Sequence, residues 1–471
     1  MMKQKNLKAY FEGYKEEFLQ DLEELISIDS TRGESEPGFP VGRGPAQALE
    51  KALEIAKRFG LYTENWENCL GIVQLNDSCE RKLDIFAHMD VVPAGEGWQV
   101  TEPFVMKLVD GCVYGRGTAD DKGPALAAIY ALRAIKEQGI ALAENVRLFL
   151  GCDEESGCLD LKMYRAKTKP AEMAFSPDGE FPVVNIEKGS LKGALTAEFP
   201  EDKRLPRIVS VQCGSSINVI PSSAKAVIEG LTAEDLKNIL NVVSEETNVD
   251  FSLEKLKGDF IGITADGEGG HASRPEQARN AATAMLQLLV RLPVAESLGF
   301  EKLQSLQEIF PHGDYYGKAA GIYMEDELSG KITVSLDILN YNGKTLTGEF
   351  DSRTPICANL ENLKPIEDMA EEKGLQYEAE REEAHHVPED TVLVKTLLKC
   401  YEAYTGFVGH CIAIGGGSYV HNMPYGVTFG CAMPGVDNRM HGPDEFADLD
   451  VLLTSGAMFA SAILELCGER N

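Results

Sequence analysis

The sequence predicts an α/β protein: a mostly parallel-sheet domain with helices on both faces, interrupted by an inserted α+β domain. Three observations lead to this fold class. Strand-like apolar runs alternate with helix-like segments near both ends of the chain, which is typical of right-handed β-α-β units. The middle of the chain instead shows short alternating strands, typical of antiparallel sheet. At 471 residues, the chain is also longer than one hydrophobic core usually serves.

The N-terminal part supplies the first helices and strands. Apolar residues from Leu7 to Ile26 recur on one helical face, and Pro45 suits the first turn of a second helix. Gly139 stops a third. The expected elements are a helix over residues 5–28, a helix from Pro45 to about Gly60, a strand at 83–87, a helix from about Gly123 to Gln138 and a strand at 146–150.

The pattern changes between about Gly189 and Glu380. Short strands (GALTAEF, AKAVIEG, KITVSLDILNYN, LTGEFDSR) occur there with helices at 233–245 and 278–292. Apolar segments rich in small residues return at 411–417 and 426–435, before a C-terminal helix rich in Leu, Ala and Met. We therefore assign residues 1–188 and 381–471 to the domain that carries the chemistry, and residues 189–380 to an inserted lid domain.

The composition argues against several classes of protein. Its 45 basic and 75 acidic side chains give a net charge of −30, which opposes binding to nucleic acid or to an anionic membrane. Uninterrupted apolar runs stay well short of 18 residues, so no transmembrane helix is expected. The eleven cysteines are an odd number without a C-x-x-C pair, and the N-terminal segment has no apolar region of a signal peptide. A cytoplasmic protein is expected.

Acidic residues and histidines gather at the ends of the apolar runs. They are His88 and Asp90 in LDIFAHMD, Asp120 in GRGTADDKG, Glu154 and Glu155 in LFLGCDEESG, Asp178 in FSPDGE, and His441 in NRMHGPDEF. Open α/β sheets place ligands at strand ends. Neutral imidazole with several carboxylates suits two adjacent divalent metal ions better than one. A further carboxylate beside the ligands, free of metal, is the base that metal-assisted hydrolysis needs.

Each of these positions also has an ordinary interpretation. H-x-D can be a surface pair, paired aspartates a helix N-terminus, and adjacent glutamates a solvated pair. Their occurrence together in five segments of one α/β domain favours a shared site. GGGS at 415–418 resembles an anion or carboxylate cradle, although a single glycine-rich turn is a weak signal. The absence of a G-x-S-x-G motif argues against a covalent mechanism.

At these residues the chain resembles the co-catalytic metallopeptidase family of aminoacylases, acetylornithine deacetylases, carnosinases and dipeptidases. The segments HMDVVPAGEGW, GRGTADDKGP, DEESG, FSPDGEFPVVNIEKG and HGPDEF look most like the bacterial PepV-type dipeptidases. The similarity covers essentially the whole length, including the inserted domain.

The resemblance implies a role for each residue of the cluster. Asp120 would bridge two zinc ions, and the peptide between Asp120 and Asp121 would be cis. One ion would be completed by His88 and Asp178, and the other by Glu155 and His441. Glu154 would be the general base and acid, while Asp90 would orient His88.

In the inserted domain, the resemblance implies three substrate-binding residues. His271 (GEGGHASRPE) matches the family's transition-state histidine, and Asn218 and Arg353 match substrate-contacting positions. Arg353 suits a free carboxylate. Two departures, His421 where many relatives carry Arg and HHVPED at 385–390, leave the substrate preference open.

The expected function is metal-dependent hydrolysis of dipeptides by a metal-activated water, with Glu154 as the base. The alternative is deacylation of an N-acyl amino acid or diamine at the same site. A metal-bound but inactive binding protein is disfavoured because Glu154 is present. Zinc, manganese and cobalt all accept these ligands. A small peptide is the expected partner, and a monomer is favoured because the long inserted domain can supply His271 within one chain.

Overall fold

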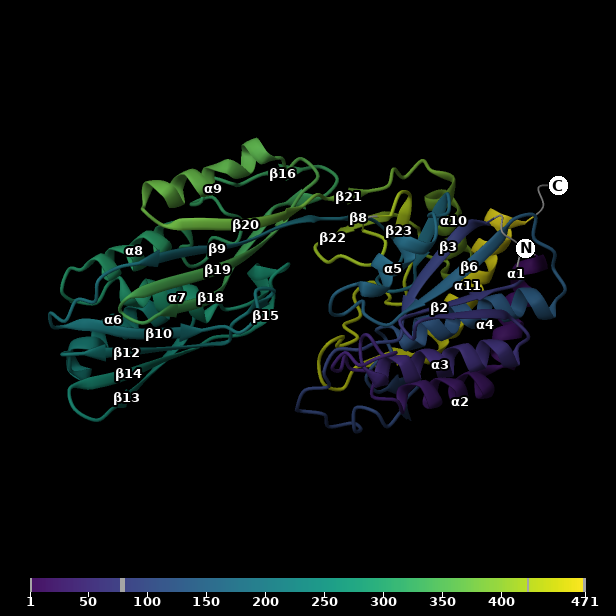
Figure 1. The fold of residues 1–471 in the computed structure, drawn as a ribbon, viewed down its shortest axis with the longest axis horizontal. Helices are drawn as coiled ribbons and strands as arrows, with labels where there is room; N and C mark the ends of the chain where they lie inside the picture. The colour runs from purple at the N-terminus through teal and green to yellow at the C-terminus, as the bar shows by residue number, and fades with distance from the viewer. Residues whose placement is uncertain (1, 77–80, 422, 469–471) are drawn as a thin grey trace. The chain divides into compact units, whose positions relative to one another are not determined.

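A computed structural model describes residues 2–76, 81–421 and 423–468, and the chain divides into two compact units (Figure 1). Unit 1 comprises Met1–Ile186, His386–Ile412 and Gly417–Asn471, and unit 2 comprises Glu187–His385 and Ala413–Gly416. The sequence had assigned residues 381–385 and 413–416 to the first domain, but both group with unit 2. Strand β20 (Gln376–Glu382) pairs along its length with β9 (Gly189–Glu198), which draws the chain into unit 2 up to that point.

The main sheet of unit 1 is parallel at its centre and antiparallel toward its edges. Its order is β1-β2-β6-β3-β7-β23-β8-β21, with β22 paired to β8. Strands β3, β6, β7 and β23 run parallel, whereas β1, β2 and β8 pair antiparallel with their neighbours. The strands are β1 (Tyr62–Trp66), β2 (Leu70–Gln74), β3 (Arg81–His88), β6 (Asn145–Gly151), β7 (Met173–Ser176), β8 (Val183–Glu187), β21 (His385–His386), β22 (Cys411–Ile414) and β23 (Gly426–Thr428).

Helices cover both faces of this sheet because alternate side chains of each central strand point to opposite faces. On β3, Ile85 packs into the larger core with helices α2 (Lys15–Ile26), α3 (Arg43–Arg58), α4 (Lys122–Glu137), α10 (Val392–Thr405) and α11 (Leu449–Cys467). The next residue, Phe86, packs on the other face, where its ring stacks on Phe149 and contacts Tyr164 of α5 (Leu159–Lys167).

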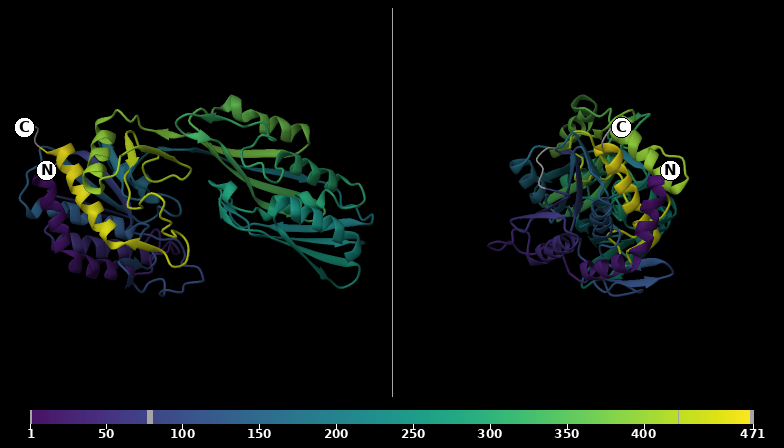
Figure 2. Two further views of the ribbon diagram at one scale, coloured as in Figure 1. Left: turned by 180° about the vertical axis from the view of Figure 1, so that it is seen from behind. Right: turned by 90° about the vertical axis from the view of Figure 1, so that its right-hand side faces the viewer.

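The helix expected over residues 5–28 is two helices, α1 (Met2–Gly13) and α2, interrupted at Tyr14. Tyr14 has φ −106° and ψ 11°, outside the helical region. The break lets α1 lie beside α11 while α2 packs against α3 and α4 (Figure 2). One amphipathic face therefore serves two packing directions.

Helix α11 is long and apolar enough to pass for a membrane span, with a mean hydropathy of 1.6. In the fold, 72% of that apolar window is buried, and the helix packs against α1, α4 and α10. It is a central core helix of unit 1. The chain enters α11 from a small three-stranded sheet of order β24-β5-β4, formed by β4 (Lys107–Val109), β5 (Cys112–Tyr114) and β24 (Phe446–Asp448).

Unit 2 contains an eight-stranded antiparallel sheet of order β13-β14-β12-β10-β18-β19-β9-β20. Its helices share one core with the apolar face of the sheet. Besides β9 and β20, the strands are β10 (Arg207–Cys213), β12 (Ser223–Glu229), β13 (Asp250–Lys255), β14 (Phe260–Asp266), β18 (Thr333–Tyr341) and β19 (Thr345–Thr354). Two-stranded pairs are formed by β11 (Val219–Ile220) with β15 (Gly270–His271) and by β16 (Glu325–Asp326) with β17 (Gly330–Lys331).

The helices of unit 2 extend beyond the two expected from the sequence. Helices α6 (Ala233–Thr247) and α7 (Ala281–Leu289) correspond to those two, whereas α8 (Leu298–Ile309) and α9 (Leu360–Glu372) were not predicted. Their N-caps, Ser297 and Asn359, accept hydrogen bonds from the first turn of each helix. Those caps are the signal that the sequence offered.

The α1–α11 contact can be tested at Phe11, which is 1% exposed. Phe11→Ala should lower the free energy of unfolding by about 3–5 kcal/mol, because the cavity left beside α11 cannot collapse fully. Calorimetric unfolding measures this change. The exposed Lys8 on the same helix is the matched control, and Lys8→Ala should stay within about 0.5 kcal/mol of the parent. Equal transitions for the two variants would contradict the packing role of α1.

Candidate metal centre

The acidic and histidine residues of unit 1 meet at the carboxyl edge of its central strands. His88 ends β3 and pairs in register with Gly151, which ends the parallel strand β6 just before Glu154 and Glu155. Strand β7 ends at Ser176, two residues before Asp178. Because parallel strands end at the same edge, these side chains converge there. Asp120 joins them from the loop between β5 and α4, and His441 from the loop before β24.

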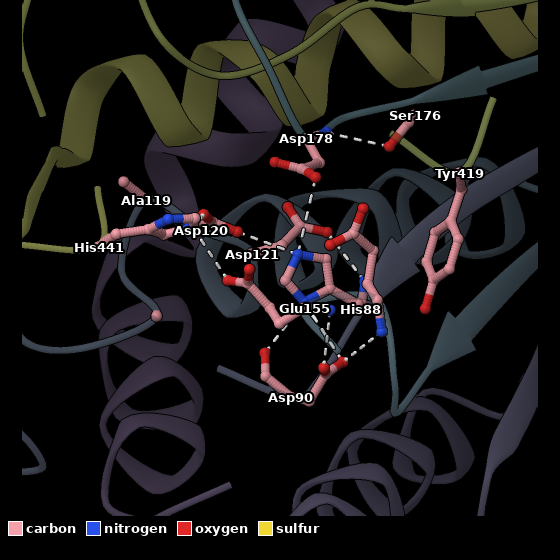
Figure 3. Close-up of polar contacts among 12 residues, drawn as sticks. His88, Asp90, Ala119, Asp120, Asp121, Glu155, Ser176, Asp178, Tyr419 and His441 are labelled. Carbon is pink, nitrogen blue, oxygen red and sulfur yellow. Dashed lines mark hydrogen bonds and ion pairs between the residues drawn. The ribbon is translucent and has the colours of Figure 1, made fainter. Parts of the chain in front are cut away.

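The Asp120 carboxylate lies between the two histidine rings (Figure 3). Its Oδ1 is 3.0 Å from Nε2 of His88, and its Oδ2 is 2.9 Å from Nε2 of His441. The aspartate is 8% exposed and His88 is fully buried. Each oxygen of one carboxylate therefore serves a different histidine.

A further carboxylate completes each half of this arrangement. Asp178 Oδ2 lies 3.6 Å from Nε2 of His88, and Glu155 Oε1 lies 3.2 Å from Nε2 of His441. Ligand atoms around a tetrahedral zinc ion are separated by about 3.3 Å, given zinc–ligand bonds of about 2.0–2.1 Å. The two sets share Asp120 and have the spacing of two adjacent metal sites.

The tautomer of His88 also fits a metal ligand. Its Nδ1 lies 2.9 Å from the backbone oxygen of Asp90, which can only accept, so Nδ1 carries the proton. The lone pair of the neutral ring is then on Nε2, which is buried without a hydrogen-bond partner among the described residues. Oε1 of Glu155 is likewise buried without one in the described part of the chain. Metal-ligating histidines typically have one nitrogen held in this way and the other directed at the ion.

The electrostatics of the cluster favour a cation. Hydrogen bonds from Asp120 and Glu155 raise the pKa of His441 to about 11. Burial raises the pKa of Asp120, but contacts with His441 and His88 outweigh it and leave the pKa lowered. Burial, with the nearby Asp120 charge, raises the pKa of Glu155 to about 7. The buried carboxylates thus hold positive charge on the rings, as they would hold it on a bound ion.

Glu154 lies beside this centre. One ligand atom each from His88, Glu154 and Asp178 lie within 4.8 Å of one another. Burial raises the pKa of Glu154 well above its usual range, and the charges of Asp178 and Glu155 add to this. A carboxyl group in such surroundings can accept and release a proton.

Asp90 has a broader role than the one expected from the sequence. Its backbone oxygen, rather than its carboxylate, lies closest to Nδ1 of His88, and its Oδ1 lies 3.5 Å from that atom. The Asp90 carboxylate accepts hydrogen bonds from the backbone N–H groups of Glu154 and Glu155, at 3.2 and 3.1 Å. It therefore holds the turn that carries both glutamates.

Three supporting residues of this centre were not identified from the sequence. Asp121 follows a cis peptide bond from Asp120, as the resemblance implied, and accepts a hydrogen bond from the His88 N–H. Asp160 accepts from the N–H groups of Cys152 and Asp153 and from the Tyr419 hydroxyl. Tyr419 follows the glycine-rich segment that the sequence singled out, but it could not be paired with Asp160 across 259 residues.

Unit 2 brings together the residues predicted for substrate binding. His271 in β15 pairs with Val219 in β11, and the backbone oxygen of Asn218 accepts from Ala272. Nδ1 of His271 accepts from the Ser273 backbone N–H at 3.0 Å and lies 2.7 Å from the Ser273 hydroxyl. With Nδ1 accepting, the neutral ring carries its proton on Nε2, which can donate.

Arg353 of β19 is 8% exposed and held by a partner that the sequence did not reveal. Its Nε and Nη2 donate to the two carboxylate oxygens of Asp351, at 2.7 and 3.0 Å, and its Nη1 donates to the Gly415 oxygen at 2.8 Å. These contacts engage three of the five N–H groups and preorganise the planar guanidinium. The Gly415 contact accounts for the grouping of residues 413–416 with unit 2.

Comparisons with known proteins agree with this centre. The model of a family described as peptidase family M20/M25/M40 matches residues 85–465. A Beta-Ala-Xaa dipeptidase from Lactobacillus delbrueckii subsp. lactis is 35% identical over 480 residues, covering 99% of this chain and 99% of the relative.

Solved structures share the fold at lower identity. Human carnosine dipeptidase 1 aligns with a TM-score of 0.60 and 14% identity, covering 98% of each chain. The dipeptidase Dug1p from Saccharomyces cerevisiae aligns with a TM-score of 0.59 and 14% identity, also over 98% of each chain. The architecture of a sheet domain with an inserted domain is therefore that of these peptidases.

The shared carboxylate yields a test of the centre. Asp120→Asn should weaken the binding of both metal ions, whereas Asp178→Asn and Glu155→Gln should each weaken one, because only Asp120 belongs to both ligand sets. Metal content after loading and dialysis, measured by mass spectrometry, distinguishes these outcomes. Asp153→Asn is the control, since this acid pairs with Arg32 outside the ligand sets. Full occupancy in the Asp120 variant would show that the carboxylate is not shared.

Proposed function

Because the chain belongs to peptidase family M20/M25/M40, we propose that it is a dipeptidase whose unit 1 holds two divalent metal ions. The observation that carries this proposal is the Asp120 carboxylate, whose two oxygens face His88 and His441. His88 and Asp178 would complete one ion, and Glu155 and His441 the other. Nitrogen and carboxylate ligands at this spacing suit zinc, and manganese or cobalt can use the same set.

The reaction proposed is hydrolysis of the peptide bond. Bound ions would polarise the scissile carbonyl and lower the pKa of a water molecule. Glu154 would take the proton of that water on a carboxylate oxygen and return it to the leaving amine. Its buried position beside His88 and Asp178 supports this role, and Asp90 fixes its backbone.

Unit 2 would supply contacts to the substrate. We assign the oxyanion contact to Nε2 of His271, because Nδ1 of that ring accepts from Ser273. Arg353 would bind the terminal carboxylate through the two N–H groups not engaged by Asp351 and Gly415. Asn218 would contact the substrate next to His271, since its backbone bonds to the adjacent Ala272.

The substrate class proposed is small dipeptides with a free carboxylate. The relative named Beta-Ala-Xaa dipeptidase matches the whole chain, which favours dipeptides over N-acyl amino acids. A monomer in the cytoplasm remains our prediction. The odd number of cysteines supports this location, because it does not suit a disulfide framework.

The first test concerns the proposed base. Glu154→Gln should retain both metal ions and lower kcat by about 100- to 10,000-fold, because the amide cannot accept the proton. Metal content and steady-state hydrolysis of a dipeptide panel provide the two readouts. The parent enzyme should hydrolyse dipeptides faster than the corresponding N-acetyl amino acids. The reverse preference would favour the deacylase function, and an unchanged kcat would remove Glu154 from the mechanism.

The second test concerns the carboxylate contact. Asp351→Asn/Arg353→Ala should mainly raise KM for free dipeptides and have little effect on amidated ones, because it removes only the group that binds the carboxylate. Asp351 is changed together with Arg353 to avoid leaving its buried charge unpaired. The control is Arg207→Ala, whose side chain pairs with Glu229 on the same sheet. Equal effects on free and amidated dipeptides would rule out the carboxylate contact.

A further inference from the structure

A buried glutamate in the His441 loop contacts the Asp120 loop, and the mechanism does not use it. Glu445 lies four residues after His441 and is fully buried. Its Oε1 accepts from the backbone N–H groups of Gly117, Ala119 and Asp120, at 3.1, 2.9 and 3.1 Å. Its Oε2 accepts from Nη1 of Arg116 at 2.7 Å and from the Gly117 N–H at 3.1 Å. One carboxylate thus binds most of the segment that ends in Asp120.

The fold fixes Glu445 at this position. Strand β24 pairs with β5 so that Phe446 lies opposite Tyr114, and the N–H of Gly115 donates to the backbone oxygen of Glu445 at 3.0 Å. The residues following β5 and those preceding β24 therefore lie next to each other. His441 and Asp444 have positive φ values of 64° and 55°, which turn the chain between the histidine and Glu445.

As a result, one loop contacts Asp120 in two ways. The His441 ring reaches the Asp120 carboxylate, and the Glu445 carboxylate reaches the Asp120 backbone. Three N–H groups converging on one buried carboxylate restrict the rotation of the peptide units around Asp120. Because the two oxygens of Asp120 face different histidines, a rotation of its backbone would disturb both ligand sets together.

A simple stabilising role for the Arg116–Glu445 pair would not require these backbone contacts. The neighbouring Asp444 provides a comparison. Its carboxylate accepts from the N–H groups of Gln99 and Val100, at 2.9 and 2.8 Å, and so holds a different segment. Only Glu445, of these two adjacent acids, contacts the Asp120 segment through the bonds described.

We propose that Glu445 is a positioning residue of the metal centre, which sets the orientation of Asp120 and thereby the affinity for both ions. This inference rests on the proposed function only in assuming that Asp120 binds metal. Outer residues that orient metal ligands typically contribute about 10- to 100-fold to affinity. The same range is expected here.

Three variants separate positioning from stability. Glu445→Gln keeps the shape but places an amide N–H₂ opposite donors, and it leaves Arg116 without its anionic partner. Arg116→Met/Glu445→Gln removes the unpaired charge as well, so the thermal stability of the metal-free protein should recover toward the parent. Asp444→Asn is the matched control from the same loop.

The measurements are zinc affinity by chelator competition, the visible spectrum of the cobalt-loaded protein, and the thermal midpoint of the metal-free protein. Both variants that carry Glu445→Gln should bind zinc about 10- to 100-fold more weakly and show altered cobalt spectra, whereas Asp444→Asn should match the parent. Continued weak binding in the double variant, despite recovered stability, would support the positioning role.

Two outcomes would overturn the proposal. Parent-like zinc affinity and cobalt spectra in Glu445→Gln would show that Glu445 does not orient the site. Recovery of affinity together with stability in the double variant would show that its role is only structural. Failure of the parent protein to bind zinc or cobalt would contradict the proposed function instead, so the two failures are distinguishable.

Discussion

The metal centre depends on the compensation of buried negative charge. Asp120, Glu155 and Asp178 converge at the edge of one sheet, where separate unpaired charges would be costly. His88 and His441 supply the only nitrogen ligands among the contacts described for this cluster, and they face opposite oxygens of Asp120. A pair of divalent cations would satisfy this arrangement of ligands better than protons on two rings.

A second regularity follows from the position of the ligands in loops. A loop at a strand end has backbone N–H groups that the sheet does not satisfy. Here a buried carboxylate binds those groups in each case. Asp90 holds the turn of Glu154 and Glu155, Asp121 binds the N–H of His88, and Asp160 binds the residues just before Glu154. Glu445 does the same for the Asp120 loop.

The amino-acid sequence determined the local features of this protein. Apolar runs identified the central strands, and the residues directly after them identified the acids and histidines, because strand ends and ligand residues lie next to each other in the chain. Helical periodicity located α3 and α4 closely, but it could not show the break at Tyr14, where the same apolar face turns to pack on two partners.

The tertiary structure decided what depends on contacts distant in the chain. Asp120 meets His441 across 321 residues, and Tyr419 meets Asp160 across 259. The partnership of Glu445 with residues 116–120 and the hold of Gly415 on Arg353 likewise come from strand pairing and loop closure. No local pattern encodes such contacts, because hydrogen-bond geometry depends on where the whole fold places each backbone group.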